Sequence, residues 1–294
     1  MNIVITIPAY NEEATIGRVI ADIKRVMSSG KYNYKILVVD DGSTDQTAII
    51  AKRGGAIVYS HPKNYGLAET FKTEIGQCLK LNADIIVHTD ADGQYQADDI
   101  PKLIKEVEHG NDLVLGSRFL GEIEYMPWIK RIGNKVFTRV ISGVARLKIR
   151  DAQTGFRAFT REVAEKLEIT SNFTYTQEQI IRAVRAKFRV KEVPIYFARR
   201  KSGRSRLMKN PFDYALRSTI SILRTYRDYE PLKFFWSFGG TLFLSGLGIG
   251  SWLLYLFITT GSIGHVPLTI LSAMLMLIGV QIMLFGFLAD ILRR

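Results

Sequence analysis

Two long apolar segments near the end of the chain place the strongest constraint on its fold. They span residues 232–258 and 266–289 and, apart from Lys233 at the start of the first, contain no Asp, Glu, Lys, Arg or His. Each exceeds the ~20 residues that a helix needs to cross a hydrocarbon core about 30 Å thick. A buried hairpin in a soluble protein seldom needs so much uninterrupted apolar sequence. We therefore predict a transmembrane helical hairpin over residues 232–294.

The distribution of basic residues predicts the orientation of this hairpin. The chain has a formal net charge of +12, and its Lys and Arg residues are dense before the first apolar segment and return at Arg293 and Arg294. The connecting residues 259–265 contain neither Lys nor Arg. Because basic residues stay on the cytoplasmic side of a membrane, we expect the N-terminal domain and the C-terminus there. The lipid bilayer is thus an expected partner of an integral membrane protein.

Residues 210–231, just before the first span, have the pattern of an amphipathic helix. Their apolar residues recur at helical spacing opposite several arginines: Phe212, Leu216, Ile220, Leu223 and Tyr226 against Arg217, Arg224 and Arg227. A helix lying at the membrane interface has this pattern. A solvated helix packed on a globular domain has it too. We predict a juxtamembrane helix and leave the choice between these environments open.

Residues 1–209 alternate short β-rich runs with helical spacing of apolar residues. The predicted strands are 3–7, 35–39, 56–59, 85–88 and 113–116, and the predicted helices are 16–27, 47–52, 67–79 and 99–109. This alternation is typical of an α/β domain with a mostly parallel, Rossmann-like sheet. Ligands of such sheets bind beyond the carboxyl ends of the strands. The residues that follow each strand are therefore the first candidates for a site.

The strongest of these motifs follows the predicted strand 85–88, where the sequence reads Asp90-Ala91-Asp92-Gly93-Gln94. Two carboxylates separated by one residue at a turn can both reach one hard divalent cation, and Gln94 can add a carbonyl oxygen. A cation there would neutralise the leaving diphosphate of a nucleotide-sugar. An Asp-x-Asp pair alone is also common in solvated turns. We expect Mg²⁺ or Mn²⁺ at Asp90, Asp92 and Gln94.

Two other strand ends carry residues suited to a nucleotide. They read Pro8-Ala9-Tyr10-Asn11-Glu12 and Val39-Asp40-Asp41-Gly42-Ser43. An acid at a strand end can bind ribose hydroxyls or a base edge, whereas Ser43 with Gln46 can instead form a helix capping box. The chain lacks both a Gly-rich dinucleotide fingerprint and a Gly-Lys-Ser/Thr phosphate loop, which argues against dehydrogenases and ATPases.

A basic loop at residues 198–209 precedes the membrane segments. It contains Arg199, Arg200, Lys201, Arg204, Arg206 and Lys209. Such a loop can cover a pyrophosphate or rest on anionic headgroups. Because no aromatic platform interleaves these charges, we expect no nucleic-acid partner.

Together these segments resemble the family-2 glycosyltransferases, whose nucleotide-sugar-binding domain has the GT-A fold. The resemblance covers residues 2–207 and depends on motifs in the family's order: Pro8-Ala9-Tyr10-Asn11-Glu12, Val39-Asp40-Asp41-Gly42-Ser43-Thr44-Asp45, Asn64-Tyr65-Gly66 and Asp90-Ala91-Asp92. Within the family, the chain is most similar to dolichyl phosphate mannose or glucose synthases. That similarity lies in Gly116-Ser117-Arg118, Asp151-Ala152-Gln153-Thr154-Gly155-Phe156-Arg157 and Glu192-Val193-Pro194-Ile195.

The resemblance implies a reaction and a set of contacts. A hexose would move from a GDP-mannose or UDP-glucose type of donor to dolichyl or polyprenyl phosphate, by metal-dependent inverting displacement. The implied nucleotide-sugar contacts are Pro8, Tyr10, Glu12, Val39, Asp41, Asp90, Ala91, Asp92, Arg118, Arg200 and Arg206. Arg118 and Arg131 would bind the lipid phosphate, with Lys130 as an alternative to Arg131.

A general base is optional for this reaction. An acceptor phosphate has a second pKa of about 6 and is already nucleophilic at neutral pH. If a base acts, Asp151 and Glu178 are the candidates. Asp151 could equally be a residue that caps a turn, and Glu178 could equally be an acid on the surface of a helix. The predicted catalytic set is Asp90, Asp92, Arg118, Asp151 and Glu178.

Two other functions fit parts of the sequence. A transferase that adds the sugar to a saccharide or glycolipid hydroxyl would need a base, and the chain lacks the Gln-x-x-Arg-Trp motif of polymerising members. A membrane scaffold with an inactive transferase fold would not need the acidic and arginine motifs that the chain retains. Gly246 and Gly250 can form a close helix contact, and thus a homo-oligomer within the membrane.

Overall fold

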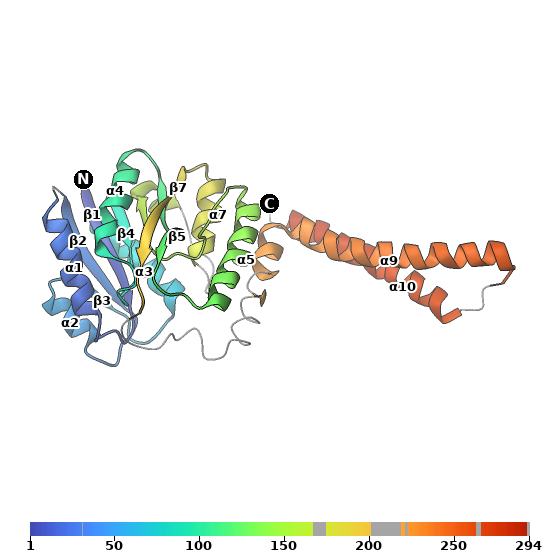
Figure 1. Cartoon of the computed structure of the whole chain (residues 1–294), viewed down its shortest axis with the longest axis horizontal. Coiled ribbons are helices and arrows are strands. Elements are labelled where there is room, and N and C mark those ends of the chain that lie inside the picture. The colour runs from blue at the N-terminus through green and yellow to red at the C-terminus, as the bar shows by residue number, and fades with distance from the viewer. Residues whose placement is uncertain (31, 167–174, 201–218, 221–222, 263–265, 293–294) are drawn as a thin grey trace. The chain divides into compact units, whose positions relative to one another are not determined.

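The computed structural model describes residues 1–30, 32–166, 175–200, 219–220, 223–262 and 266–292. The chain divides into two compact units, Met1–Ala215 and Leu216–Arg294. Figure 1 shows a sheet with surrounding helices in the first unit and two long paired helices in the second.

A seven-stranded sheet with the order β3-β2-β1-β4-β6-β5-β7 forms the centre of the first unit. The strands are β1 (Asn2–Ala9), β2 (Asn33–Asp40), β3 (Ile57–Ser60), β4 (Ile85–His88), β5 (Leu113–Ile123), β6 (Arg157–Thr160) and β7 (Val190–Phe197). β1 pairs in parallel with β2 and β4, β2 with β3, and β5 with β7. The predicted mostly parallel α/β sheet is confirmed.

The strands β6 and β7 are not among those that the sequence pattern predicts. β6 has four residues, begins at the buried Arg157, and runs antiparallel to both β4 and β5. β7 contains Pro194, which has no backbone N–H group to donate to a neighbouring strand. At the edge of the sheet, beside β5 only, this missing donor is tolerated.

Most helices of the first unit pack their apolar faces against the sheet, while α5 packs mainly against α7. They are α1 (Ile16–Ser28), α2 (Thr47–Arg53), α3 (Leu67–Lys80), α4 (Ile100–Glu108), α5 (Trp128–Ala145), α6 (Arg161–Lys166) and α7 (Tyr175–Arg185), and a short 3₁₀ turn covers Ala97–Asp99. The predicted apolar face of α1 is buried, with Ile16, Ile20 and Ile23 at most 1% exposed. Pro101 lies in the first turn of α4. A backbone N–H group there would have no acceptor within the helix, so proline loses no hydrogen bond.

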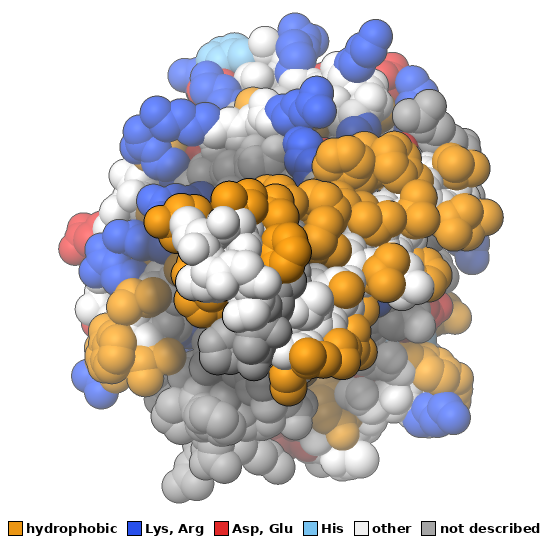
Figure 2. Space-filling model, turned by 90° about the vertical axis from the view of Figure 1, so that its right-hand side faces the viewer, with side chains coloured by type: hydrophobic (Ala, Val, Ile, Leu, Met, Phe, Trp, Pro, Cys, Tyr) orange, Lys and Arg blue, Asp and Glu red, His pale blue; other side chains and the backbone are white. Residues whose placement is uncertain are grey.

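Helices α9 (Pro231–Thr260) and α10 (Val266–Ile291) form the second unit's hairpin. Each is long and apolar enough to cross a membrane, which agrees with the two predicted spans. Large hydrophobic side chains such as Leu244, Leu277 and Phe285 are more than 50% exposed, as lipid-facing residues would be. Figure 2 shows hydrophobic side chains, in orange, gathered in patches on the face that this view presents.

Small residues bring α9 and α10 close together. The buried positions recur every seven residues on both helices: Gly239, Gly246 and Leu253 on α9, and Ser272, Gly279 and Gly286 on α10. A Cβ atom at Gly246 would lie 2.7 Å from the Ser272 carbonyl oxygen, and one at Gly250 would lie 2.9 Å from Ser272 Oγ. These glycines therefore serve the contact within one hairpin, and the expected homo-oligomer contact through them has no support.

The predicted juxtamembrane helix at 210–231 falls partly outside the described residues. Of this segment the structure describes 219–220 and 223–231, and residues 223–229 are helical. Ile220 and Leu223 are 40% and 42% exposed. The interfacial placement of this segment stays a prediction.

Replacing Gly239 with valine should destabilise the hairpin, whereas the same change at the adjacent Gly240 should not. A Cβ atom at Gly239 would lie 2.5 Å from the Gly279 carbonyl oxygen, but one at Gly240 meets nothing within 4 Å. Overpacking of this kind costs about 1–3 kcal/mol. Denaturation by SDS in mixed micelles can be followed through Trp236, whose ring packs edge-on against Phe287. Equal denaturation midpoints for Gly239→Val and Gly240→Val would show that the helices do not meet here.

Candidate active site

The carboxyl ends of β1, β2 and β4 lie at one edge of the sheet because β1 is parallel to both neighbours. The two loops after β1 and β2 interlock there. The Asn11 backbone N–H donates to Ser43 Oγ (2.9 Å), and the Thr44 N–H donates to Asn11 Oδ1 (2.8 Å). Pro8 and Val39, two predicted nucleotide contacts, are paired residues at the ends of these strands.

Asp41 is buried and organises the loop at residues 63–66. Its carboxylate accepts the N–H groups of Tyr65 and Gly66, each at 2.9 Å, and lies 2.8 Å from His61 Nδ1. The loop packs tightly on Gly42, where a Cβ atom would lie 2.5 Å from the Lys63 carbonyl carbon. Asp41 thus holds the loop at residues 63–66 in place beside the end of β2. The sequence pattern does not reveal this role.

Asp90 and Asp92 lie at the end of β4, facing charged groups from distant parts of the chain. Arg200 donates from Nη2 to Glu12 Oε1 (3.0 Å), and its Nη1 lies 3.7 Å from Asp92 Oδ2. Burial and the nearby Asp92 carboxylate raise the pKa of Asp90 to about 6. The structure therefore brings Glu12, Asp92 and Arg200 into contact, with Asp90 beside Asp92.

Gln94 is largely engaged with the end of β7. Its backbone carbonyl accepts the Ala198 N–H (2.9 Å), and its Nε2 donates to the Ala198 carbonyl (3.1 Å). These bonds tie the Asp90 loop to the residues that lead to Arg200. Within the described residues, no group of three or more His, Cys, Asp or Glu side chains is placed to hold a metal ion.

A fully buried polar network that the sequence analysis missed lies beneath Asp90. His88 Nδ1 donates to the Gly155 carbonyl (2.8 Å), and His88 Nε2 lies 3.2 Å from Glu74 Oε2. Glu74 Oε1 accepts a hydrogen bond from Thr6 Oγ1 (2.8 Å). Burial lowers the pKa of His88, but Glu74 outweighs this effect and the pKa is raised overall. Thr6, Glu74 and His88 are 0% exposed, so this network holds the end of β4 in position from within the core.

The sequence does contain a signal for this network. His88 is the one polar residue of the four in β4, and Glu74 lies on the buried face of α3 with Phe71 and Cys78. An acid on an apolar helix face needs a buried partner. The pattern alone does not say which one.

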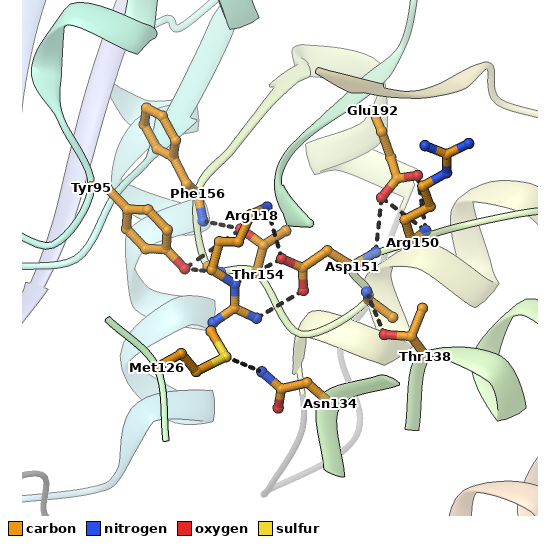
Figure 3. Close-up of polar contacts among 12 residues, drawn as sticks. Tyr95, Arg118, Met126, Asn134, Thr138, Arg150, Asp151, Thr154, Phe156 and Glu192 are labelled. Carbon is orange, nitrogen blue, oxygen red and sulfur yellow. Dashed lines mark hydrogen bonds and ion pairs between the residues drawn. The ribbon is translucent and has the colours of Figure 1, made fainter. Parts of the chain in front are cut away.

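Arg118, in the middle of β5, forms a buried, bidentate ion pair with Asp151 (Figure 3). Arg118 Nε donates to Asp151 Oδ2 (2.7 Å) and Nη2 donates to Oδ1 (2.8 Å), while the Arg118 backbone N–H also reaches Oδ2 (3.0 Å). Burial lowers the pKa of Arg118, but the Asp151 carboxylate more than offsets this and raises it overall. Both oxygens of Asp151 are thus occupied by Arg118.

Further hydrogen bonds hold the loop that carries Asp151. Glu192 accepts the N–H groups of Arg150 and Asp151, each at 2.9 Å, and Thr138 Oγ1 accepts the Ala152 N–H (3.1 Å). Burial raises the pKa of Glu192, although the hydrogen bonds from the N–H groups of Arg150 and Asp151 act to lower that pKa. The loop is therefore fixed to β7 on one side and to α5 on the other.

Arg157 is a second buried arginine, and the sequence analysis gave it no role. It is 0% exposed and donates to the carbonyls of Thr154 (2.9 Å) and Thr176 (2.7 Å) and to Gln179 Oε1 (2.9 Å). Burial lowers its pKa to about 10. Arg157 joins β6 to the start of α7, next to the predicted base Glu178.

The remaining predicted residues lie in varied surroundings. Glu178 is buried on α7 and accepts a hydrogen bond from Arg182 Nε (2.8 Å). Ala91 is buried between the two acids, Tyr10 is half-buried, and Arg131 is exposed on α5. Arg206 lies outside the described residues.

Comparison with known proteins gives a family and a fold. The family described as Glycosyl transferase family 2 matches residues 4–168. A dolichyl-phosphate hexose transferase of Haloferax volcanii is 33% identical over 212 residues, which cover 72% of this chain and 88% of the relative. A dolichol-phosphate mannosyltransferase of Pyrococcus furiosus is 30% identical over 272 residues, which cover 89% of this chain and 74% of the relative.

A solved structure shares the fold of the first unit. Glucosyl-3-phosphoglycerate synthase of Mycobacterium tuberculosis, solved with Mn²⁺, UDP and phosphoglyceric acid, superposes with a TM-score of 0.59 at 21% identity. The superposition covers 75% of this chain and 78% of that one. The GT-A architecture expected from the sequence is therefore confirmed.

Removing one partner of the Arg118–Asp151 pair should destabilise the chain more than removing both charges. Breaking a buried pair leaves an uncompensated charge and costs about 3–5 kcal/mol. We expect Arg118→Met and Asp151→Asn each to lower unfolding stability strongly. The double variant should be clearly more stable than the sum of the two losses predicts, as measured by chemical denaturation in detergent. Additive losses would show that the two side chains do not interact.

Substituting Gly155 with alanine should disturb Asp90 without unfolding the domain. A Cβ atom at Gly155 would lie 3.0 Å from Asp90 Oδ1, so the carboxylate must shift. Loss of a supporting contact around a metal ligand typically weakens metal binding roughly tenfold to a hundredfold. Calorimetric titration with Mn²⁺ can measure this, with Gly76→Ala as the control because a Cβ atom there meets nothing within 4 Å. Unchanged Mn²⁺ affinity in Gly155→Ala would remove Asp90 from the metal site.

Proposed function

Because this chain belongs to glycosyl transferase family 2 and is a glycosyltransferase, we propose that it moves a hexose from a nucleotide-sugar to a dolichyl or polyprenyl phosphate. The observation that carries the proposal is the meeting of Glu12 and Asp92 with the guanidinium of Arg200 at one strand-end edge, where Asp90 lies beside Asp92. A membrane-embedded acceptor also suits a chain with two helices apolar enough to cross a bilayer.

Asp90 and Asp92 would hold a Mg²⁺ or Mn²⁺ ion. Mg²⁺ is commonly bound through one or two carboxylates plus substrate phosphates, so this pair is a sufficient set of protein ligands. A cation would also relieve the unfavourable proximity of the two acids that raises the pKa of Asp90. When bound, the cation would supply Lewis-acid neutralisation of the leaving diphosphate. Gln94 could add its side-chain Oε1, because the bonds to Ala198 use its Nε2 and its backbone carbonyl.

The donor would lie across the interlocked loops after β1 and β2. The side chains assigned to it from the sequence are Pro8, Tyr10, Glu12, Val39, Asp41 and Ala91. Arg200, which donates a hydrogen bond to Glu12, would donate to a diphosphate oxygen when the donor is bound. Arg206 remains a proposal from the sequence alone.

The acceptor phosphate would be held by Arg118 with either Lys130 or Arg131. Lys130 has the better claim, because burial and the nearby Arg118 lower its pKa, whereas Arg131 is exposed. Asp151 uses Nε and Nη2 of Arg118, which leaves Nη1 as the donor for a phosphate. Asp151 is then a positioning residue, because a carboxylate that is 0% exposed and saturated by an arginine is poorly suited to accept a substrate proton. Glu178 is likewise bonded to Arg182.

Catalysis in this scheme depends on alignment and charge. A deprotonated acceptor oxygen would attack the anomeric carbon directly, with inversion, while the arginines and the acidic pair keep donor and acceptor in line. No general base is then needed, since a phosphate is already nucleophilic at neutral pH. By the positive-inside pattern, we place the catalytic domain and the C-terminus on the cytoplasmic side.

Replacing Asp92 with asparagine should lower turnover by at least roughly a hundredfold, because several kcal/mol of charge stabilisation depend on the bound cation. Asp22→Asn is the matched control, because Asp22 is an exposed acid on α1 whose contacts are with Arg18 and Arg25. The assay gives purified full-length protein labelled UDP- or GDP-sugars and a polyprenyl phosphate. Transfer is measured as label that partitions into organic solvent.

The same assay tests the acceptor. Label in a lipid that mild acid releases as free sugar supports a sugar phosphodiester of the polyprenol. Label in a saccharide would instead indicate a hydroxyl acceptor, and no transfer with any donor would refute the proposed reaction. Near-normal turnover of Asp92→Asn in Mg²⁺ would refute the metal assignment.

A further inference from the structure

His61 is a buried histidine, just after β3, that the proposed reaction does not use. Its Nδ1 donates to Asp41 Oδ1 (2.8 Å), because a carboxylate only accepts hydrogen bonds. Its Nε2 lies 2.9 Å from Thr73 Oγ1 on α3. The rings of Tyr59 and Tyr65 meet the imidazole edge-on, with centroids 5.9 and 5.1 Å away. These contacts hold the imidazole in one orientation toward Asp41.

Hydrogen bonds from the protein use most of the capacity of Asp41 as an acceptor. A carboxylate has about four lone-pair sites, two on each oxygen. Oδ1 of Asp41 accepts two bonds, from His61 Nδ1 and from the Tyr65 N–H (2.9 Å), and Oδ2 accepts one, from the Gly66 N–H (2.9 Å). Among the residues that the structure describes, these are its hydrogen-bond donors, so one site on Oδ2 is left for a ligand. The side chain of Asp41 is 6% exposed, so a ligand reaches it through a small opening.

The two types of donor that the proposed function allows differ at such a contact. The Watson–Crick edge of guanine presents two adjacent N–H groups, at N1 and N2, which match both oxygens of a carboxylate. The same edge of uracil presents a single N–H group, at N3. Guanine would therefore need an open site on Oδ1 as well as on Oδ2, but His61 and Tyr65 occupy Oδ1. A base N–H group that is buried without an acceptor costs binding affinity.

We propose that His61, acting through Asp41, selects a uridine diphosphate sugar over a guanosine diphosphate sugar as the donor. The inference rests on the proposed function, in which Asp41 binds the nucleotide. Oδ2 of Asp41 accepts the uracil N3–H, while the hydrogen bond from His61 keeps Oδ1 from accepting a second N–H of the base. His61 is a positioning residue, because it contacts Asp41 and not the nucleotide. The contact with Thr73 keeps the imidazole from turning away from Asp41.

Binding of UDP and GDP to the full chain in detergent, with Mn²⁺, tests this inference without any transfer reaction. Isothermal titration calorimetry should give UDP a Kd that is roughly tenfold to a hundredfold lower than that of GDP, as paired base contacts typically discriminate. Modified nucleotides locate the contact in the unaltered chain. A methyl group on uracil N3 removes the donor and should weaken binding by a similar factor. The control is 5-methyl-UDP, which keeps the N3–H group and should bind as UDP does.

Two variants of His61 separate base selection from simple support of the loop. Asparagine places an amide N–H group close to the position of Nδ1, whereas leucine has nearly the same shape without a donor. His61→Leu opens Oδ1 and should bring the ratio of the GDP and UDP Kd values roughly tenfold closer to one, through tighter GDP binding. His61→Asn should keep the ratio of the unaltered chain. If His61 only supported the loop, His61→Leu would weaken both nucleotides equally and leave the ratio unchanged.

Three results would overturn the inference. They are GDP binding at least as tightly as UDP, N3-methyl-UDP binding as tightly as UDP, and an equal change for both nucleotides in His61→Leu. Each of them leaves the proposed hexose transfer intact, because the transfer assay with labelled donors decides that reaction separately. Binding of neither nucleotide would overturn both the inference and the proposed function.

Discussion

The parallel pairing of β1 with β2 on one side and β4 on the other is the constraint on which the site depends. Its register sets Ala9 beside Asp40 and Thr6 beside His88, so the three strands end at neighbouring points. Chain segments that are 30 to 80 residues apart thereby turn into loops at one edge. Backbone N–H groups of one loop then bind side chains of the next, as Asn11 binds Ser43. A strand end is also where polar groups can leave the core without losing backbone hydrogen bonds.

Buried charge gives this edge its rigidity. Arg118 occupies both carboxylate oxygens of Asp151, Arg157 donates to two carbonyls and to Gln179, and Glu74 lies against Thr6 and His88. Isolated buried charges of this kind are costly, and they are tolerated only when hydrogen bonds satisfy them. Such bonds are directional, so they fix the backbone under Asp90 and beside Arg118 more narrowly than apolar packing would. The antiparallel strand β6 is part of this arrangement, because it carries Arg157 between β4 and β5.

The two units of the chain differ in which side chains they bury and which they expose. In the first unit, the apolar faces of helices such as α1 and α4 are covered by the sheet. In the hairpin, the small residues face inward and the large ones outward, because Gly239 and Gly279 allow the backbones to approach closely. Helix α5 is intermediate, with one face in the core and the other exposed.

The features that depend on local pattern could be predicted from the amino-acid sequence. Apolar length gave the two hairpin helices, periodicity gave β1 to β5 and α1 to α4, and the motif order gave the family and the acids at the strand ends. Which residues bind one another follows from the arrangement of distant elements in three dimensions. Asp151 pairs with Arg118 across 33 residues, Gln94 binds Ala198 across 104, and Gly246 is covered by Ser272 of the same hairpin. Periodicity reports which face of an element is apolar, but a pairing partner depends on how distant elements are placed, and no local pattern encodes that.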